Sequence, residues 1–216
     1  MRCSSRLGAL AALLIPFAAE AQVGLAARAS TLGIGAELSL RAGSRLGLRL
    51  GGHYFQISRD VTIEGNRYTA TPHFENGVAL VDVFPFGGTF HVTGGVILNY
   101  NEGRLAAHLP VTIDGRTYSE TEVSSMTGGV TFDRTAPYLG IGLAGQGRVE
   151  LLLDLGVGFT GTPIVGLGAE TSLQGAEQLE LEARLARERD EVQADISKHA
   201  WLRYHPVLSI GLKLGF

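Results

Sequence analysis

Side chains of two kinds alternate over the last segment of the chain, and this alternation restricts the folds that the chain can adopt. From Leu202 to Phe216 every second residue is apolar or aromatic, and the residues between them, apart from Val207, are small or polar. A repeat of two residues is that of a β-strand, in which successive side chains point to opposite faces. The alternation outlasts the roughly 5–6 residues of an average soluble strand and suits the roughly 9–11 residues of a tilted membrane strand.

The same alternation recurs along the chain, with weaker apolar faces in some segments. It predicts eight strands, at about 30–41, 46–57, 76–84, 89–101, 136–145, 148–160, 163–171 and 202–216. Antiparallel strands with one apolar face can close into a barrel, which leaves no unpaired sheet edge in lipid. The predicted fold is therefore all-β, an antiparallel transmembrane β-barrel of about eight strands. A soluble β-sandwich is the alternative that composition alone leaves open.

The composition agrees with a barrel and argues against other classes of protein. Charged residues make up 18% of the chain, against roughly 25% in average soluble domains. No internal stretch contains the roughly 18 apolar residues that a membrane-spanning helix needs. The net charge of −3 argues against nucleic acid as a partner, because nucleic-acid-binding proteins carry a basic patch or stripe.

The N-terminus has the three parts of a secretory signal peptide. Arg2 and Arg6 precede an apolar segment, Leu7 to Phe17, and Ala19-Glu20-Ala21 forms a small-residue cleavage site. Cleavage after Ala21 predicts a signal over 1–21 and a barrel over 22–216. The chain has one cysteine, at position 3 before the apolar segment, so the mature protein is expected to have no disulfide and no thiolate chemistry. An uncleaved N-terminal anchor is the alternative.

The connections between the predicted strands are of two lengths. Short turns fall at 42–44, 85–88 and 145–147, and long polar connections at 58–75 and 101–135. Outer-membrane barrels combine short periplasmic turns with long external loops. Each long loop contains a similar segment, VTIEGNRY from Val61 and VTIDGRTY from Val111, which predicts a small hairpin around a glycine turn. A hairpin duplication and a convergent turn both explain the similarity.

Residues 173–200 depart from the alternation and predict a helical insertion before the last strand. The segment lacks proline and has one glycine, near its start, and apolar residues fall on one helical stripe at Leu181, Leu185, Val192 and Ile196. Pairs of opposite charge four residues apart support the helix at Glu180–Arg184 and Arg187–Glu191. We expect a surface helix with one packed stripe; a plug at the barrel mouth and a docking helix for a partner are the alternatives.

The predicted strands leave a conflict of topology. If the long loops are external and the strands alternate in direction, the eighth strand runs outward and the chain ends outside the cell. The usual arrangement places the C-terminal aromatic residue on the periplasmic side. Either the strand count is off by one, because 23–41 or 163–171 is misinterpreted, or the helix changes the route of the chain.

With these features in place, the chain resembles the small outer-membrane β-barrel proteins of Gram-negative bacteria. The resemblance rests on the signal, the alternating strands and the ending VLSIGLKLGF. It implies export through the periplasm, integral insertion in the outer membrane and contact with its lipid. It also implies that the insertion machinery recognises the terminal segment as an assembly signal through Leu212, Leu214 and Phe216. The helical insertion departs from the simplest members, so no specific role follows from the resemblance.

Polar residues on the inward faces of the strands are the candidate functional residues. Charges inside a closed barrel must pair or be hydrated, so we expect an interior network. Its candidate members are Glu37, Arg49, Asp82, Glu150, Asp154 and Lys213. Small barrels of about eight strands are filled by their own side chains, which favours this interpretation over a selective conduit or a ligand site.

Three functions are compatible with these features. The first is a non-enzymatic barrel with a structural or surface-interaction role through the loops at 58–75 and 101–135, whose partner the sequence leaves unidentified. The second is a narrow transporter or a barrel that binds a small apolar ligand. The third is a lipid-modifying enzyme, for which His53, Ser58 and His73 are the candidates near the outer rim. Extended strand geometry separates His53 from Ser58 by about 17 Å, and no cofactor or metal motif is present.

Overall fold

A computed structural model describes residues 21–63 and 65–216, so the predicted signal lies outside the described residues. Eight strands form a barrel: β1 (Ala21–Ser30), β2 (Gly33–Ala42), β3 (Leu46–Gln56), β5 (Asn66–Val83), β6 (Phe90–Asn99), β11 (Thr135–Ala144), β12 (Val149–Phe159) and β14 (Tyr204–Gly215). The remaining elements lie beyond one end of it: β4 (Arg59–Ile63), β7 (Glu102–Ala107), β8 (Val111–Ile113), β9 (Arg116–Tyr118), β10 (Val123–Thr131), β13 (Ile164–Thr171), α1 (Ala176–Lys198) and the 3-10 helix η2 (Ala200–Arg203).

Antiparallel pairing closes the barrel through its first and last strands. The ladder runs β1-β2-β3-β5-β6-β11-β12-β14 and returns to β1, where Leu25 pairs with Leu214 and Ala29 with Ile210. Closure gives every barrel strand two hydrogen-bonded neighbours, which is the condition for crossing lipid without unpaired backbone groups. The predicted eight-stranded antiparallel barrel is confirmed.

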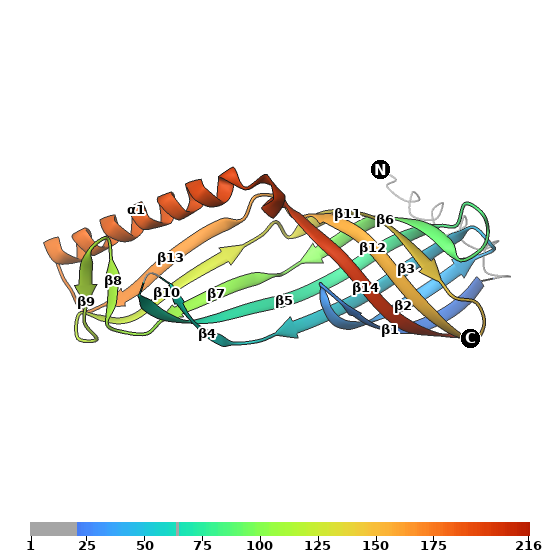
Figure 1. Cartoon of the computed structure of the whole chain (residues 1–216), viewed down its shortest axis with the longest axis horizontal. Helices are drawn as coiled ribbons and strands as arrows, with labels where there is room; N and C mark the ends of the chain where they lie inside the picture. Colours follow the sequence, from blue (N-terminus) through green and yellow to red (C-terminus); the bar gives the residue numbers. More distant parts are fainter. Residues whose placement is uncertain (1–20, 64) are drawn as a thin grey trace, which may run out of the picture.

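A branch of the same sheet, called here the extension, continues one side of the wall beyond the barrel (Figure 1). Strand β5 is 18 residues long. Its second half pairs with β3 and β6 in the barrel, whereas its first half pairs with β4 and β7. From β7 the sheet continues through β10 to β13. Both predicted hairpins are present, since Val61 pairs with Tyr68 and Val111 with Tyr118.

The eight barrel strands are not all the predicted ones. The predicted strand at 30–41 hides a turn at Thr31 and Leu32, and its first partner, β1, was not predicted. The alternating outward side chains of β1 include small alanines, Ala27 and Ala29, which weaken its apolar face. The predicted strand at 163–171 exists as β13, but it pairs only with β10 in the extension. One strand was missed and one misplaced, so the count of eight was unchanged.

This correction removes the conflict of topology. With β1 included, the first strand of the barrel starts and the last strand ends at the same end as the three short turns. Figure 1 shows the C-terminus at this end, opposite α1. The conflict is therefore explained by the misinterpretation of 23–41 and 163–171, and the chain ends on the side of the short turns. We call the two ends of the barrel the short-turn end and the extension end.

Along β5 the two faces of the strand exchange character where the barrel meets the extension. The outward side chains, in order from the barrel to the tip, are Val83, Val81, Ala79, Gly77, Glu75, His73, Thr71 and Thr69. The inward ones are Asp82, Leu80, Val78, Asn76, Phe74, Pro72, Ala70 and Tyr68. The outward face changes from apolar to polar at Glu75, whereas the inward face, which carries Asp82 and Asn76 within the barrel, has no charged or amide side chain from Phe74 onwards. This exchange marks the outer limit of the lipid, because a wall in water buries its apolar face inward.

Helix α1 covers the extension on its inner face, which is the face that continues the barrel lumen. Leu181 and Leu185 are buried in a cluster with residues of the β8–β9 hairpin and with Met126 of β10. Gln193 accepts a hydrogen bond from the backbone N–H of Val165, so α1 also lies along the outer edge of β13. The predicted helix is confirmed, and its packed stripe is confirmed at these two leucines but is wrong at Val192, which is exposed. Among the described residues, no helix is long and apolar enough to cross a membrane.

Candidate functional site

Five charged residues from five strands meet inside the barrel, and we call them the ion cluster. They are Arg28, Glu37, Arg49, Asp82 and Asp154. Arg49 contacts three carboxylates: Nε lies 2.7 Å from Asp82 Oδ2, Nη2 lies 3.1 Å from Asp154 Oδ1, and Nη1 lies 3.4 Å from Glu37 Oε2. Arg28 contacts Asp154, and its Nε lies 2.8 Å from Glu37 Oε2. These contacts pair buried charges that would otherwise be strongly unfavourable.

The structure brings four of the six predicted interior residues together and places two elsewhere. Glu37, Arg49, Asp82 and Asp154 belong to the ion cluster. Glu150 and Lys213 form a separate pair nearer the short-turn end, 2.8 Å apart. There the lumen widens into an open mouth of about 1050 Å³, which both residues line.

Arg28 is the member of the ion cluster that sequence reasoning missed. It lies on β1, the strand that was not predicted. A short alternation could have indicated this strand, with small inward residues at Gly24 and Ala26 and apolar outward residues at Val23 and Leu25. Two imidazoles complete the shell of the cluster: His91 Nε2 lies 3.0 Å from Asp154 Oδ1, and His53 Nε2 lies 3.5 Å from Glu37 Oε1.

Apolar layers lie on both sides of the ion cluster. Towards the extension, the layer consists of Leu32, Val78, Leu80, Ile97, Ala136, Tyr138 and Val207. Towards the short turns, it consists of Ala26, Phe84, Ala144 and Leu152. Glycines make room for the ring of Tyr138, because a Cβ at Gly140 or Gly156 would approach its hydroxyl to 2.5 or 2.4 Å. Tyr138 thus fills the part of the lumen where the facing wall residues are glycines without side chains.

Two small cavities remain between these layers. One, of about 30 Å³, lies between the ion cluster and Phe84, and the other, of about 20 Å³, lies between the cluster and Tyr138. A cavity needs roughly 10–15 Å³ to hold one water molecule. Each therefore has room for about one or two waters.

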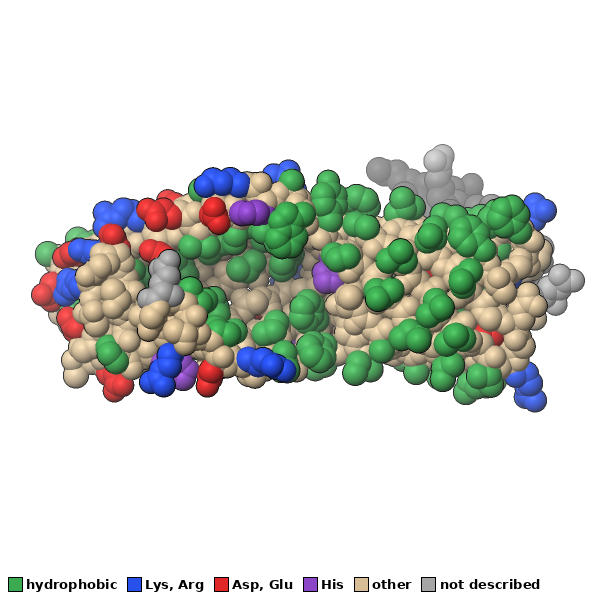
Figure 2. Space-filling view, in the orientation of Figure 1, with side chains coloured by type: hydrophobic (Ala, Val, Ile, Leu, Met, Phe, Trp, Pro, Cys, Tyr) green, Lys and Arg blue, Asp and Glu red, His purple; other side chains and the backbone are tan. Residues whose placement is uncertain are grey.

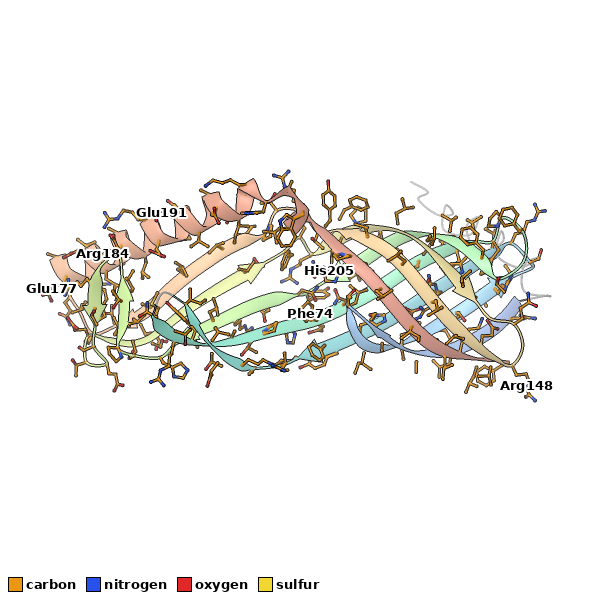
Figure 3. All side chains as sticks on the ribbon, in the orientation of Figure 1. Phe74, Arg148, Glu177, Arg184, Glu191 and His205 are labelled. Atoms are coloured by element: carbon orange, nitrogen blue, oxygen red, sulfur yellow. The ribbon has the colours of Figure 1, made fainter. Side chains whose placement is uncertain are left out.

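At the extension end, an asparagine layer and an aromatic rim close the lumen. Asn76 Nδ2 donates to the backbone oxygen of Leu32 and to Asn101 Oδ1, at 3.0 and 2.9 Å. Above this layer, Phe74 lies 6.3 Å from Phe55 and 6.4 Å from the imidazole of His205, measured between ring centroids. Figure 3 shows Phe74 and His205 together at the opening between the barrel and the extension.

The three candidate catalytic residues do not form a catalytic arrangement. His53 is buried in the lumen beside Glu37. Ser58 Oγ lies 3.0 Å from Thr71 Oγ1, and the ring nitrogens of His73 lie 3.2 Å from Gln56 Oε1 and 3.3 Å from Glu75 Oε2. Nucleophilic catalysis requires a base within hydrogen-bond reach of the nucleophile. Among the described residues, no group of three or more His, Cys, Asp or Glu could hold a metal ion.

Ionic contacts fasten α1 to the tip of the extension. Arg184 Nη1 donates to the backbone oxygen of Asp114 at 2.6 Å, and its Nη2 lies 2.8 Å from Glu180 Oε1, which confirms that predicted pair. Arg187 lies 3.0 Å from the Asp114 carboxylate. The hydrogen bond from Arg184 lowers the pKa of Glu180 below its ordinary value and raises that of Arg184.

Apolar side chains form a belt on the barrel exterior (Figure 2), and aromatic residues bound it at both ends. Exposed outward residues include Leu38, Leu48, Val81, Ile141, Leu153, Leu155 and Ile210. Aromatic residues at the extension end of the belt are Tyr54, Tyr100, Phe159 and Tyr204, and those at the short-turn end include Phe86 and Phe216. A soluble protein does not expose so large an apolar surface. A band of this kind between two aromatic girdles is the lipid-facing surface of a membrane barrel.

Comparison with solved structures supports this assignment of the fold. Acinetobacter baumannii CarO2 is 21% identical, with a TM-score of 0.59 over 90% of this chain and 98% of that one. CarO from the same organism is 21% identical, with a TM-score of 0.57 over 90% and 97%. A major outer membrane protein from Thermus thermophilus is 15% identical, with a TM-score of 0.42 over 91% and 98%. No protein-family model and no curated protein matches the chain.

The closed barrel, the apolar belt and the likeness to the two Acinetobacter structures agree. The fold is that of a small outer-membrane β-barrel. In such barrels the short turns face the periplasm and the long connections face outside. By this rule we expect the extension and α1 of this outer-membrane barrel at the cell surface and Phe216 on the periplasmic side.

Proposed function

We propose that this outer-membrane barrel does not conduct and that it anchors the extension at the cell surface as an interaction module. The observation that carries the proposal is the ion cluster, which ties β1, β2, β3, β5 and β12 together across the lumen. A barrel of about eight strands has an interior only wide enough for its own side chains. Opening a conduit would require these buried charges to separate, at a cost of several kcal/mol for each one left unpaired.

The extension supplies the surface for the interaction. The predicted loops at 58–75 and 101–135 are largely strands of this sheet, held by the apolar cluster under α1. A rigid sheet presents side chains at fixed positions, so it is better suited to recognising a partner than a flexible loop is. Its outward face includes a shallow groove of about 610 Å³, with Thr69, Thr71, Arg104 and Thr127 in its lining. No catalytic step is part of the proposal.

The proposal includes two contacts in the membrane. Outer-membrane lipid surrounds the belt, and the insertion machinery recognises the terminal strand during assembly. Leu212, Leu214 and Phe216 support the second contact, because they point outward and are 58%, 51% and 80% exposed. In the closed barrel they are accessible from the lipid side.

A leak assay tests the proposed function. The purified protein is reconstituted into vesicles that contain a small fluorescent dye and a potassium gradient, with a known porin as the positive control. The expected result is retention of dye and ions, as in protein-free vesicles. Stepwise conductance or dye release by the folded protein would establish a transporter instead. Mass spectrometry of the vesicle lipids tests catalysis separately: a lipid product that disappears with His73→Ala would indicate an enzyme.

A further inference from the structure

The extension surrounds only part of the barrel opening. Strands β1 and β2 are joined by two residues, Thr31 and Leu32, and end at the outer limit of the lipid. Thr31 Oγ1 donates to the backbone oxygen of Pro206 at 2.8 Å, which fixes this turn against β14. Because the neighbouring wall stops here while β5 continues, the inner face of the extension is open on this side (Figure 1). Figure 2 shows the molecule hollowed at this place, below α1.

Apolar and small side chains line the inner face of the extension at this opening. The register aligns two rows across β5, β7, β10 and β13. The first row is Pro72, Gly103, Val130 and Val165, and the second is Ala70, Leu105, Gly128 and Leu167. Neither row contains a charged residue. The two rows lie between the apolar cluster under α1 and the barrel rim.

The rim of the opening is also apolar and partly exposed. Phe55 points to the inner side and is 40% exposed, and Phe74 beside it is half-buried. The Nε2 atom of His205 next to Phe74 is buried and has no hydrogen-bond partner among the described residues. A water-filled cleft would place these aromatic rings in contact with solvent.

The lipid-facing belt reaches the edge of this opening. Ile34 and Leu208 lie on the outer surface just below the β1–β2 turn and are 68% and 63% exposed. Leu32 of the turn is buried in the lumen, but Ile34 pairs with Tyr54 of β3, and Phe55 of the rim is the next residue of that strand. The exposed apolar surface of the belt therefore reaches to within one residue of Phe55, which lies beside Phe74 at the rim. Below the rim, the asparagine layer and the ion cluster exclude an apolar molecule from the lumen.

We propose that the inner face of the extension binds the acyl chain of an outer-leaflet lipid, which enters sideways over the β1–β2 turn. Continuity with the lipid belt identifies the occupant, since an acyl chain can reach the rim without crossing water. The proposal names the ligand class of the surface module and rests on the closed barrel proposed above. The acyl chain exchanges with the leaflet and does not cross the membrane.

Fluorescence quenching tests the occupant. The chain has one tryptophan, so Trp201→Phe removes the native signal and Phe74→Trp places a reporter at the rim. His73→Trp is the matched control, because neighbouring residues of β5 point to opposite faces. Ile34→Trp reports direct lipid contact. Each protein is reconstituted into vesicles of brominated phospholipid or into unbrominated vesicles with iodide in the buffer.

Acyl binding predicts that Phe74→Trp loses emission to brominated lipid about as strongly as Ile34→Trp and is protected from iodide. His73→Trp should show the opposite pattern. Adding Val130→Glu on the inner face should abolish the bromine quenching of Phe74→Trp, whereas Thr131→Glu on the outer face should leave it unchanged. Heat-dependent gel migration confirms that each variant is folded; where Val130→Glu fails this test, Leu105→Gln replaces it.

Two results would overturn the proposal. Quenching of Phe74→Trp by iodide and not by brominated lipid would mean a water-filled cleft. Protection from both quenchers, together with cross-linked dimers, would mean that a second copy covers the face. Dye retention in the same vesicles tests whether the barrel is closed, independently of the quenching result. If bromine quenching is lost in vesicles that retain dye, only the proposed acyl binding is ruled out. If dye leaks while quenching is intact, only the proposed closed barrel is ruled out.

Discussion

Arg49 Nη2 lies 3.1 Å from Asp154 Oδ1, although the two residues are 105 positions apart in the sequence. The contact crosses the lumen from β3 to β12. Both side chains are buried, so the contact determines which inward residues meet across the lumen. Several consequences of this arrangement, and of the exchange of faces along β5, can be measured.

Removing the central arginine should strongly destabilise the barrel. Arg49→Met leaves Asp82 and Asp154 buried with fewer partners, and breaking a buried ion pair by removing one member costs about 3–5 kcal/mol. The free energy of unfolding in vesicles, measured by urea titration, should fall by this amount. Arg104→Met is the control, because the Arg104 side chain is 69% exposed. Equal stability of the two variants would contradict a structural role for the ion cluster.

Position along β5 should decide how an added charge is tolerated. Val81 and Thr71 point outward from the same strand, Val81 in the lipid belt and Thr71 beyond Glu75. An arginine on the lipid face costs roughly 2–4 kcal/mol at the middle of the bilayer and little beyond its surface. Val81→Arg should therefore impair folding into vesicles, whereas Thr71→Arg should fold normally. Similar folding yields would place the outer limit of the lipid elsewhere.

Truncation of the packed stripe of α1 should loosen the extension and leave the barrel intact. Leu181 is 1% exposed and Leu179 is 66% exposed, which makes them a matched pair on one helix. Leu181→Ala should cost about 2–5 kcal/mol locally, seen as faster hydrogen exchange in α1 and β13. Leu179→Ala should have little effect. Heat-dependent gel migration should be the same for both, and a change of migration in Leu181→Ala would mean that barrel and extension unfold together.

Acid should weaken the ionic attachment of α1 to the tip of the extension. Because the pKa of Glu180 is lowered in the folded protein, its contribution is fully present above the ordinary pKa of about 4.5 and is lost as the pH falls through the lower folded value. Protection of the α1 amides from hydrogen exchange, relative to the intrinsic exchange rate at each pH, should decrease below about pH 4, with the barrel strands still protected. Glu180→Gln should reduce the acid dependence. If exchange in α1 does not respond to acid in either protein, the contact with Arg184 does not hold the helix.

The two ends of the molecule should be accessible from opposite sides of the membrane. The only cysteine, Cys3, lies in the predicted signal. An introduced cysteine is therefore expected to be the single thiol that a maleimide can label in the mature chain. Ala194→Cys on α1 should react with an impermeant maleimide in intact cells. Gln146→Cys in a short turn should react only after the outer membrane is opened. The reverse pattern would place the extension in the periplasm.

The sequence predicts the barrel better than it predicts the extension. Strands such as β14 have a strong apolar face because lipid surrounds them, so alternation alone identifies them. Strands β7 and β10 lie in water, and their outward residues, such as Arg104 and Thr127, resemble those of polar loops. The helix was predictable because Leu181 and Leu185 keep helical spacing among charged residues.

Interior candidates were predictable one strand at a time, but their contacts were not. Alternation places Glu37, Asp82 and Asp154 on inward faces. Which of them meet depends on the stagger between strands around the barrel, and local periodicity contains no such information. This is why Glu150 and Lys213 form a pair of their own and why Arg28 joins the cluster from a strand that alternation had left out.

Helix α1 has a consequence for how copies of this protein meet one another. Strand β13 is the last strand of the extension, and an uncovered last strand offers its backbone groups to any neighbouring chain. The side chain of Gln193 accepts a hydrogen bond from the backbone N–H of Val165 and donates one to the backbone oxygen of Pro163 at 3.0 Å. The helix thus occupies the place of a further strand and ends the sheet. On a crowded cell surface, this cover leaves fewer backbone groups of β13 free to pair with an adjacent copy.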